Sequence, residues 1–101
     1  MSSKQSGASQ ILEERSRQVY HEGFTSENDD KSNGEFAIAA VCYALPPGWP
    51  SRIEGRAPNI WPWSESWWKP GDGSTEGRVK ELVKAGALIA AEIDRLQRTL
   101  I

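Results

Sequence analysis

Cysteine and histidine are almost absent from this chain of 101 residues, and long apolar runs are missing. Cys42 is the single cysteine, which excludes an internal disulfide, and His21 is the single histidine, so a zinc site or a Cys–His nucleophile pair would rest on single copies. The apolar segment 37–45 has nine residues, whereas a helix that crosses a bilayer needs about 20. The sequence therefore predicts neither a disulfide framework nor a membrane span, and we expect Cys42 to be a small core residue.

An excess of charge of one sign is missing as well. Lysine and arginine number 12 against 14 aspartates and glutamates, which gives a net charge of −2. Proteins that grip a nucleic acid duplex need a broad basic surface to neutralise its phosphates, so duplex binding is not expected. The N-terminus lacks the basic and then apolar pattern of a signal peptide, and we expect a cytoplasmic protein.

Three segments carry the apolar spacing of helices. The first, residues 10–22, follows a small and polar stretch, 1–9, that we expect to be a flexible tail, with Ser9 as the helix cap. The second, residues 33–45, is apolar on all sides, which is typical of a helix at the centre of a bundle. The third, residues 76–99, has apolar residues that step by three and four, which predicts one buried face. That face holds Val79, Leu82, Val83, Gly86, Ala87, Ala90, Ile93 and either Leu96 or Gln97.

Two local features of these segments give further expectations. Glu13 and Arg17 stand four residues apart, in the order that favours an ion pair along a helix. Gly86 lies within the third segment, where a glycine costs about 1 kcal/mol relative to alanine. We therefore expect a neighbour to pack closely against Gly86, either the second helix or a tryptophan.

Residues 46–75 form an unusual segment, because all six prolines and all five tryptophans of the chain lie in it. A segment of about 30 residues without regular structure is rare in a compact domain and indicates either disorder or function. Disordered linkers lack aromatic residues, whereas each tryptophan can bury on the order of 200 Å². The sequence therefore predicts one mainly α domain over residues 10–101, with three helices and a Trp/Pro-rich ordered loop packed over them.

Four carboxylates near the second helix are candidates for a magnesium site: Glu27, Asp29, Asp30 and Glu35. Their spacing does not fit a calcium loop, since Lys31 and Ala40 stand where such a loop needs oxygen ligands. The segment 27–30 matches one Glu-x-x-Asp element of the all-α nucleotide pyrophosphohydrolases, but the Glu-x-x-Glu element of that class is missing. Turn and cap hydrogen bonds are the favoured interpretation, so we assign no catalytic residue, metal ligand or cofactor, and the roles of His21 and Glu22 stay open.

Recognition of a ligand is the interpretation that the tryptophans favour. A rigid aromatic surface flanked by cations can stack a base and pair with phosphates, and stacking contributes about 1–3 kcal/mol per base. The candidate stacking residues are Trp63, Trp67 and Trp68, and the candidate phosphate partners are Arg15, Arg17, Arg78 and Lys84, with Arg52 and Arg56 nearby in the sequence. Two alternatives stay open: the tryptophans form the core of the domain, or the same surface docks a protein.

Two stretches of the chain resemble small proteins encoded by tailed phages and prophages. The first runs from Glu13-Glu14-Arg15 through Glu22-Gly23-Phe24-Thr25 and Asp29-Asp30 to Gly34-Glu35-Phe36-Ala37. The second runs from Trp61-Pro62-Trp63 through Trp67-Trp68-Lys69-Pro70 to Glu81-Leu82-Val83-Lys84-Ala85-Gly86-Ala87. The chain departs from these proteins at Phe24 and Asn28, where they usually have tryptophan and histidine. The order of helix, acidic loop and apolar helix is also similar, more weakly, to the ryanodine-receptor repeat domain.

The resemblance implies a phage accessory protein that acts in the cytoplasm of the infected bacterium and counters host antiviral defence. One implied activity is sequestration of a small signalling nucleotide, either a cyclic nucleotide or a derivative of ADP-ribose. The alternative is an inhibitor that binds a host defence protein directly, and a magnesium-dependent nucleotide pyrophosphohydrolase is a third hypothesis. We also expect a homo-oligomer, because a chain this short gains depth for a pocket by pairing two copies.

Overall fold

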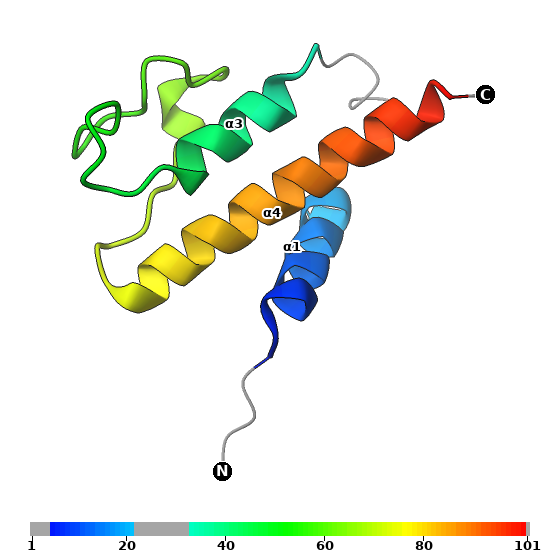
Figure 1. The fold of residues 1–101 in the computed structure, drawn as a ribbon, viewed down its shortest axis with the longest axis horizontal. Coiled ribbons are helices and arrows are strands. Elements are labelled where there is room, and N and C mark those ends of the chain that lie inside the picture. Colours follow the sequence, from blue (N-terminus) through cyan, green and yellow to red (C-terminus); the bar gives the residue numbers. More distant parts are fainter. Residues whose placement is uncertain (1–4, 22–32, 101) are drawn as a thin grey trace.

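The computed structural model describes residues 5–21 and 33–100, and these form three α-helices and one short 3₁₀ turn. The helices are α1 (Gly7–His21), α3 (Glu35–Ala44) and α4 (Thr75–Arg98), and the 3₁₀ turn is η1 (Glu65–Trp67) (Figure 1). The described residues include no β-strand. The mainly α prediction with three helices is confirmed.

The longest helix, α4, holds the other two helices together. Within the described residues α3 packs on α4 and α1 packs on α4, and the two shorter helices lie on opposite sides of it (Figure 1). The molecule is thin, with principal extents of 42 × 40 × 21 Å. The main cluster of buried apolar residues lies between α3 and α4. The described helices thus do not surround a central core as they would in a bundle.

Small side chains line the contact between α3 and α4. Ala39, Ala40 and Cys42 on α3 meet Ala85 and Ala91 on α4, and all five are almost fully buried. Burial also raises the pKa of the Cys42 thiol above its ordinary value, in keeping with its predicted place as a small core residue. Small residues at such a contact let two helix backbones approach closely. Aromatic rings from the loop pack against the same cluster of buried residues.

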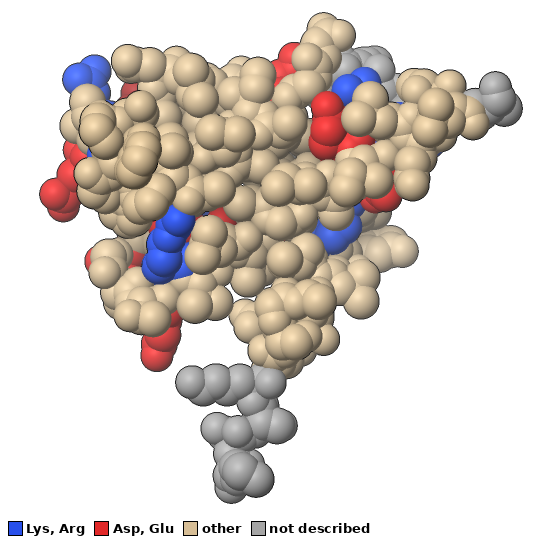
Figure 2. Space-filling view, in the orientation of Figure 1, with Lys and Arg blue, Asp and Glu red and all other residues tan. Residues whose placement is uncertain are grey.

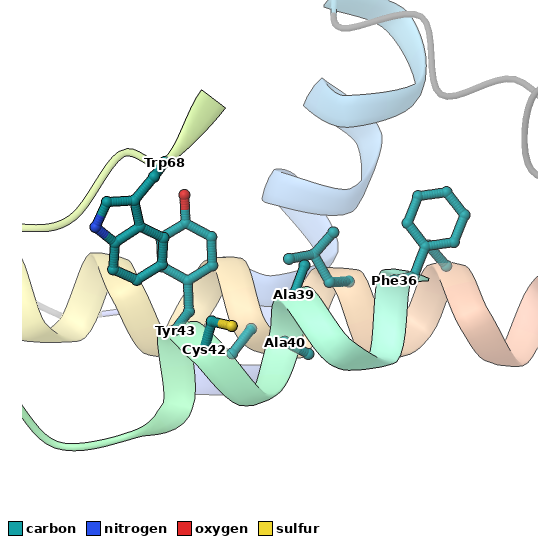
Figure 3. Packing of buried hydrophobic residues seen from close by; sticks show 9 residues of the cluster. Phe36, Ala39, Ala40, Cys42, Tyr43 and Trp68 are labelled. Carbon is teal, nitrogen blue, oxygen red and sulfur yellow. The ribbon is translucent and has the colours of Figure 1, made fainter. Parts of the chain in front are cut away.

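The loop between α3 and α4 supplies those rings. Figure 3 shows the indole of Trp68 lying against the ring of Tyr43 on α3, with ring centroids 4.6 Å apart and planes 25° from parallel. Trp61 meets both rings edge-on at 5.6 and 5.0 Å, and Trp63 meets Phe36 edge-on at 5.9 Å. Aromatic pairs in such geometries stabilise a fold beyond the area they bury. The predicted packing of the loop over the helices is thus seen for the aromatic cluster.

The helix ends follow from local caps. Ser74 accepts a hydrogen bond from the amide of Gly77 at 2.9 Å and starts α4 at Thr75, one residue before the predicted start. Two prolines follow α3, which ends at Ala44, one residue before its predicted end. At α1 the prediction of a start at residue 10 was wrong, because Ser6 rather than Ser9 accepts the first capping bond, from the Ser9 amide at 3.1 Å.

Two predicted neighbours differ from those observed. Arg17 pairs with Glu14, at 2.7 Å and three residues away, instead of with Glu13. Gly86 is approached by Ile11 of α1, not by α3 or a tryptophan, and a Cβ atom at position 86 would collide with that side chain. A lone glycine marks a close approach, but the sequence does not say which element approaches.

The predicted buried face of α4 was also wrong in part. Val79, Leu82 and Ile93 are 41–49% exposed, whereas Ala85 and Ala87 are buried. The contact with α3 uses mainly the small residues of α4 together with Leu88, and most of its large aliphatic side chains stay on the surface. Apolar spacing of three and four identifies an apolar face without showing whether the same chain covers it.

Candidate functional site

The three tryptophans predicted to stack a base lie in different environments. Trp68 is only 9% exposed, because Tyr43 lies against its ring and the guanidinium of Arg52 lies 5.3 Å from its centroid. Trp63 is partly buried against the core, and Trp67 is 55% exposed. Of the three, Trp67 presents the most surface to a ligand, and Trp68 belongs to the core.

The four predicted phosphate partners divide into two pairs. Arg15 and Arg17 lie on α1, where Arg15 donates to Asp94 at 3.2 Å and Arg17 to Glu14. Asp94 lies 16 residues beyond Arg78 on α4, about 24 Å along the helix axis. The structure therefore places Arg15 away from the start of α4.

Arg78 and Lys84 lie with the aromatic cluster. The ammonium of Lys84 is 5.4 Å from the centroid of the Tyr43 ring and donates to the carbonyl of Lys69 at 3.1 Å. Arg78 donates to the carbonyls of Tyr43 and Leu45 at 2.8 and 3.0 Å, and also to that of Ala44. These carbonyls end α3, so Arg78 caps that helix and offsets the negative end of its dipole.

Glu81 is the centre of a buried polar network that joins α4 to the loop. It is 3% exposed and accepts hydrogen bonds from both terminal nitrogens of Arg52, from Arg78 at 3.1 Å and from the amide of Gly71 at 2.7 Å. Burial by itself raises the pKa of Glu81, but the hydrogen bonds from Arg52, Gly71 and Arg78 outweigh it and hold the pKa below its ordinary value. One carboxylate thus faces two guanidinium groups, and the network carries a net charge of +1.

A cleft of about 470 Å³ opens beside this network. The turn 53–56 forms one wall, the segment 70–74 forms the other, and Arg52, Trp68, Arg78 and Glu81 line it as well. Arg56 is exposed in the turn and adds a third guanidinium. The cleft therefore combines an aromatic ring with three arginines, two of them held by Glu81, and its walls also carry the carboxylates of Glu54 and Asp72.

The wall at 70–74 is fixed by close backbone contacts. A Cβ atom on Gly71 would lie 2.6 Å from the carbonyl oxygen of Gly77, and one on Gly77 would lie 2.5 Å from Oδ1 of Asp72. Asp72 in turn accepts from the hydroxyl of Ser74 at 2.5 Å and from its amide at 2.9 Å, and these two hydrogen bonds lower the pKa of its carboxyl. The segment before α4 is thus bound tightly to the first turn of that helix.

Sequence reasoning missed Glu81 and the glycines of this wall. A signal for Glu81 was present, because it precedes Ala85 and Leu88 by four and seven residues and so shares their face of α4. A charged residue at an apolar helical spacing indicates a buried partner of opposite charge. No local signal identified Arg52 as that partner, since 29 residues separate the two.

The residues considered for metal binding are only partly described. The side chain of His21, Glu22 and the acidic segment 27–30 lie outside the described residues. Over residues 5–21 and 33–100, no group of three histidine, cysteine, aspartate or glutamate side chains could hold a metal ion. In the same residues, none of the helices has the length and apolar content needed to span a bilayer.

Comparison with known proteins finds no match for this chain among protein families, curated proteins or solved structures. The resemblance to phage proteins therefore stays a prediction from the sequence.

Proposed function

We propose that this chain is a non-catalytic binding protein and that it holds a small nucleotide in the cleft beside Glu81. The volume of about 470 Å³ falls within the range of about 300–1,000 Å³ that is typical of small-molecule sites. A nucleotide combines a flat base with an anionic phosphate, and the cleft offers an indole edge together with guanidinium groups. Arginine pairs with phosphate through two parallel hydrogen bonds, which gives both affinity and orientation.

The observation that carries the proposal is the uneven charge of the buried network. Two guanidinium groups share one carboxylate, so a phosphate meets a net positive charge where it reaches the buried group of Arg52, Arg78 and Glu81. Coulombic attraction is stronger there than on an open surface. The walls add Arg56, Glu54 and Asp72, so the lining as a whole has as many carboxylates as arginines. Arg52 and Arg78 are also fixed by the carbonyls that end α3, and donors held in place before binding lower the entropy cost of binding.

The biological setting of the proposal comes from the resemblance alone. A phage accessory protein that counters host defence would take a signalling nucleotide, either cyclic or derived from ADP-ribose. Sequestration requires affinity without turnover, and the cleft described here supplies binding groups for that purpose.

The test is a titration of tryptophan fluorescence and of binding heat with a panel of cyclic nucleotides and ADP-ribose derivatives. We expect at least one compound to bind and Arg56→Gln to weaken it about tenfold, equivalent to about 1.4 kcal/mol. Arg17→Gln is the matched control, because that arginine is also exposed but lies on α1, and it should bind like the wild type. No binding by any compound, or equal weakening by both variants, would contradict the proposal.

A direct protein-binding function is the second candidate, and one observation favours it. The loop exposes four large apolar side chains at 55–58%: Trp49, Ile53, Ile60 and Trp67. Large, rigid side chains of this kind dominate the binding energy of protein interfaces. If this candidate is correct, a purified host defence protein binds the wild type, and Trp67→Ser weakens that complex without changing the helical circular dichroism.

A further inference from the structure

Five large aliphatic side chains of α4 between residues 79 and 96 are 41–49% exposed, whereas the alanines at 85, 87 and 91 are at most 4% exposed. Leu88 is the buried exception, at 3%, and Val83 is partly buried. The exposed set consists of Val79, Leu82, Ile89, Ile93 and Leu96, with Leu100 just after the helix at 81%. A helix that served only its own domain would bury its large side chains and expose its small ones.

The exposed side chains follow a strict repeat along α4. Positions 79, 82, 86, 89, 93, 96 and 100 alternate steps of three and four residues, and none of the seven is charged. We call these seven positions the α4 stripe. A seven-residue repeat keeps one seam of a helix facing a second helix. The part of the stripe within the helix, 79–96, is about 26 Å long at 1.5 Å per residue, enough for a partner helix to follow it.

The three described helices leave most of the α4 stripe exposed. Helix α3 packs on Ala85, Leu88 and Ala91, which lie on a different face of α4. Helix α1 also packs on α4, and it meets the stripe where Ile11 lies against Gly86. The next residue, Leu12, is 68% exposed, so α1 adds to the apolar surface instead of covering it.

The area of this surface is near what a stable dimer needs. A fully exposed aliphatic side chain presents on the order of 100 Å² of apolar surface. With the exposed fractions above, Leu12 and the aliphatic residues of the stripe present roughly 400 Å² per copy, or roughly 800 Å² for two copies. Stable dimers bury about 1,200–2,000 Å² in total, and about 65% of a homodimer interface is apolar. Two stripes together supply the apolar part of an interface at the lower end of that range.

We propose that a second copy of this chain covers the α4 stripe, in a two-fold dimer whose interface is formed by the two α4 helices. A two-fold interface uses the same patch on both copies, and an uncharged apolar stripe with a heptad repeat is complementary to itself. A partner of another kind would need charges or shape to match, and the stripe offers no charge. This inference is independent of the nucleotide cleft, which lies at the start of α4.

Sedimentation velocity over a wide range of protein concentration tests the dimer. The wild type should sediment at twice the mass of one chain, 11.2 kDa, and dissociate on dilution. Ile89→Glu places a charge at the middle of the stripe and should weaken the dimer by about 100-fold or more. Ile60→Glu is the matched control, because Ile60 lies in the loop with a similar exposure of 55%, and it should change the dimer affinity by no more than about twofold.

Circular dichroism and a second variant keep the test decisive if one variant unfolds. Ile93→Gln removes apolar surface without adding a charge, and it should weaken the dimer about tenfold while keeping the helical signal. A wild type that stays monomeric at every concentration overturns the inference, including one that gains mass only when lipid vesicles or another protein are added. A folded Ile89→Glu or Ile93→Gln protein that dimerises as well as the wild type overturns it too.

Discussion

Replacing Glu81 with alanine is the most informative single change to this fold. The carboxylate accepts hydrogen bonds from Arg52, Arg78 and the amide of Gly71. The side chains of Arg52 and Glu81 are 7% and 4% exposed, so water reaches neither readily. Glu81→Ala therefore leaves a buried guanidinium without its carboxylate and a backbone amide without its acceptor.

The expected loss of stability is large for a chain of this size. Removing one partner of a buried ion pair costs about 3–5 kcal/mol, because the other charge stays buried and uncompensated. A domain of about 100 residues is stable by about 5–15 kcal/mol in total. At about 4–8 °C per kcal/mol, the midpoint of thermal unfolding should fall by at least about 12 °C.

Thermal and urea unfolding, followed by tryptophan fluorescence and far-ultraviolet circular dichroism, measure the effect. Glu76→Ala is the control, since Glu76 is an exposed carboxylate in the first turn of the same helix, where loss of its interaction with the helix dipole costs at most about 1 kcal/mol. A free energy of unfolding for Glu81→Ala within about 1 kcal/mol of the wild type would refute the reasoning. It would mean that the ion pair contributes no more than an exposed one.

Three further predictions follow from the same contacts. The pKa of Glu81 is lowered in the folded chain, so its contribution to stability is present above its unfolded pKa of about 4.3 and is lost as the pH falls through the folded value. Glu81→Gln should therefore reduce the decline of the free energy of unfolding at acid pH, measured by urea unfolding. A decline as steep as that of the wild type would contradict this prediction. Gly71→Ala should destabilise the fold by about 1–3 kcal/mol because its Cβ meets the carbonyl of Gly77, whereas Gly48→Ala, with nothing within 4 Å, should stay within about 0.5 kcal/mol; equal effects would rule out a rigid wall. Trp68→Ala should cost about 3–5 kcal/mol in denaturant unfolding, but Trp67→Ala, at a 55% exposed site, less than about 1 kcal/mol; a stable Trp68→Ala protein would show that the aromatic cluster does not hold the loop.

Local signals in the sequence predicted the helices well. Helix α4 was placed within one residue at each end, and α3 within two, because apolar spacing and proline act over a few residues. The start of α1 was missed because Ser6 and Ser9 are both competent caps, and spacing does not decide between them. Interactions between residues close in the sequence therefore determine where the helices begin and end, except where two nearby serines can both cap a helix.

The candidate site was predicted less well than the helices, because it depends on contacts between residues that are far apart in the sequence. The tryptophans were expected to be either a stacking platform or a core, and only packing distinguishes Trp68, which lies on Tyr43, from Trp67, which faces solvent. Arg78 was predicted to meet a phosphate, whereas the structure shows it on the carbonyls that end α3 and on Glu81. Periodicity shows which faces of a helix are apolar or charged, but it does not show which partner each face meets.

The network around Glu81 connects the fold to the proposed cleft and separates two kinds of arginine. Arg52 holds both Glu81 and the carbonyl of Leu45, so its position is set by folding, and any change to it alters stability and binding together. The side chain of Arg56 is exposed on the cleft wall. On the face of the molecule drawn in Figure 2, the cations are isolated groups rather than a continuous basic field. Among the three arginines of the cleft, Arg56 is therefore the one whose replacement can change ligand binding without changing stability. A loss of affinity in a fully stable Arg56 variant measures the electrostatic contribution of that side chain to binding.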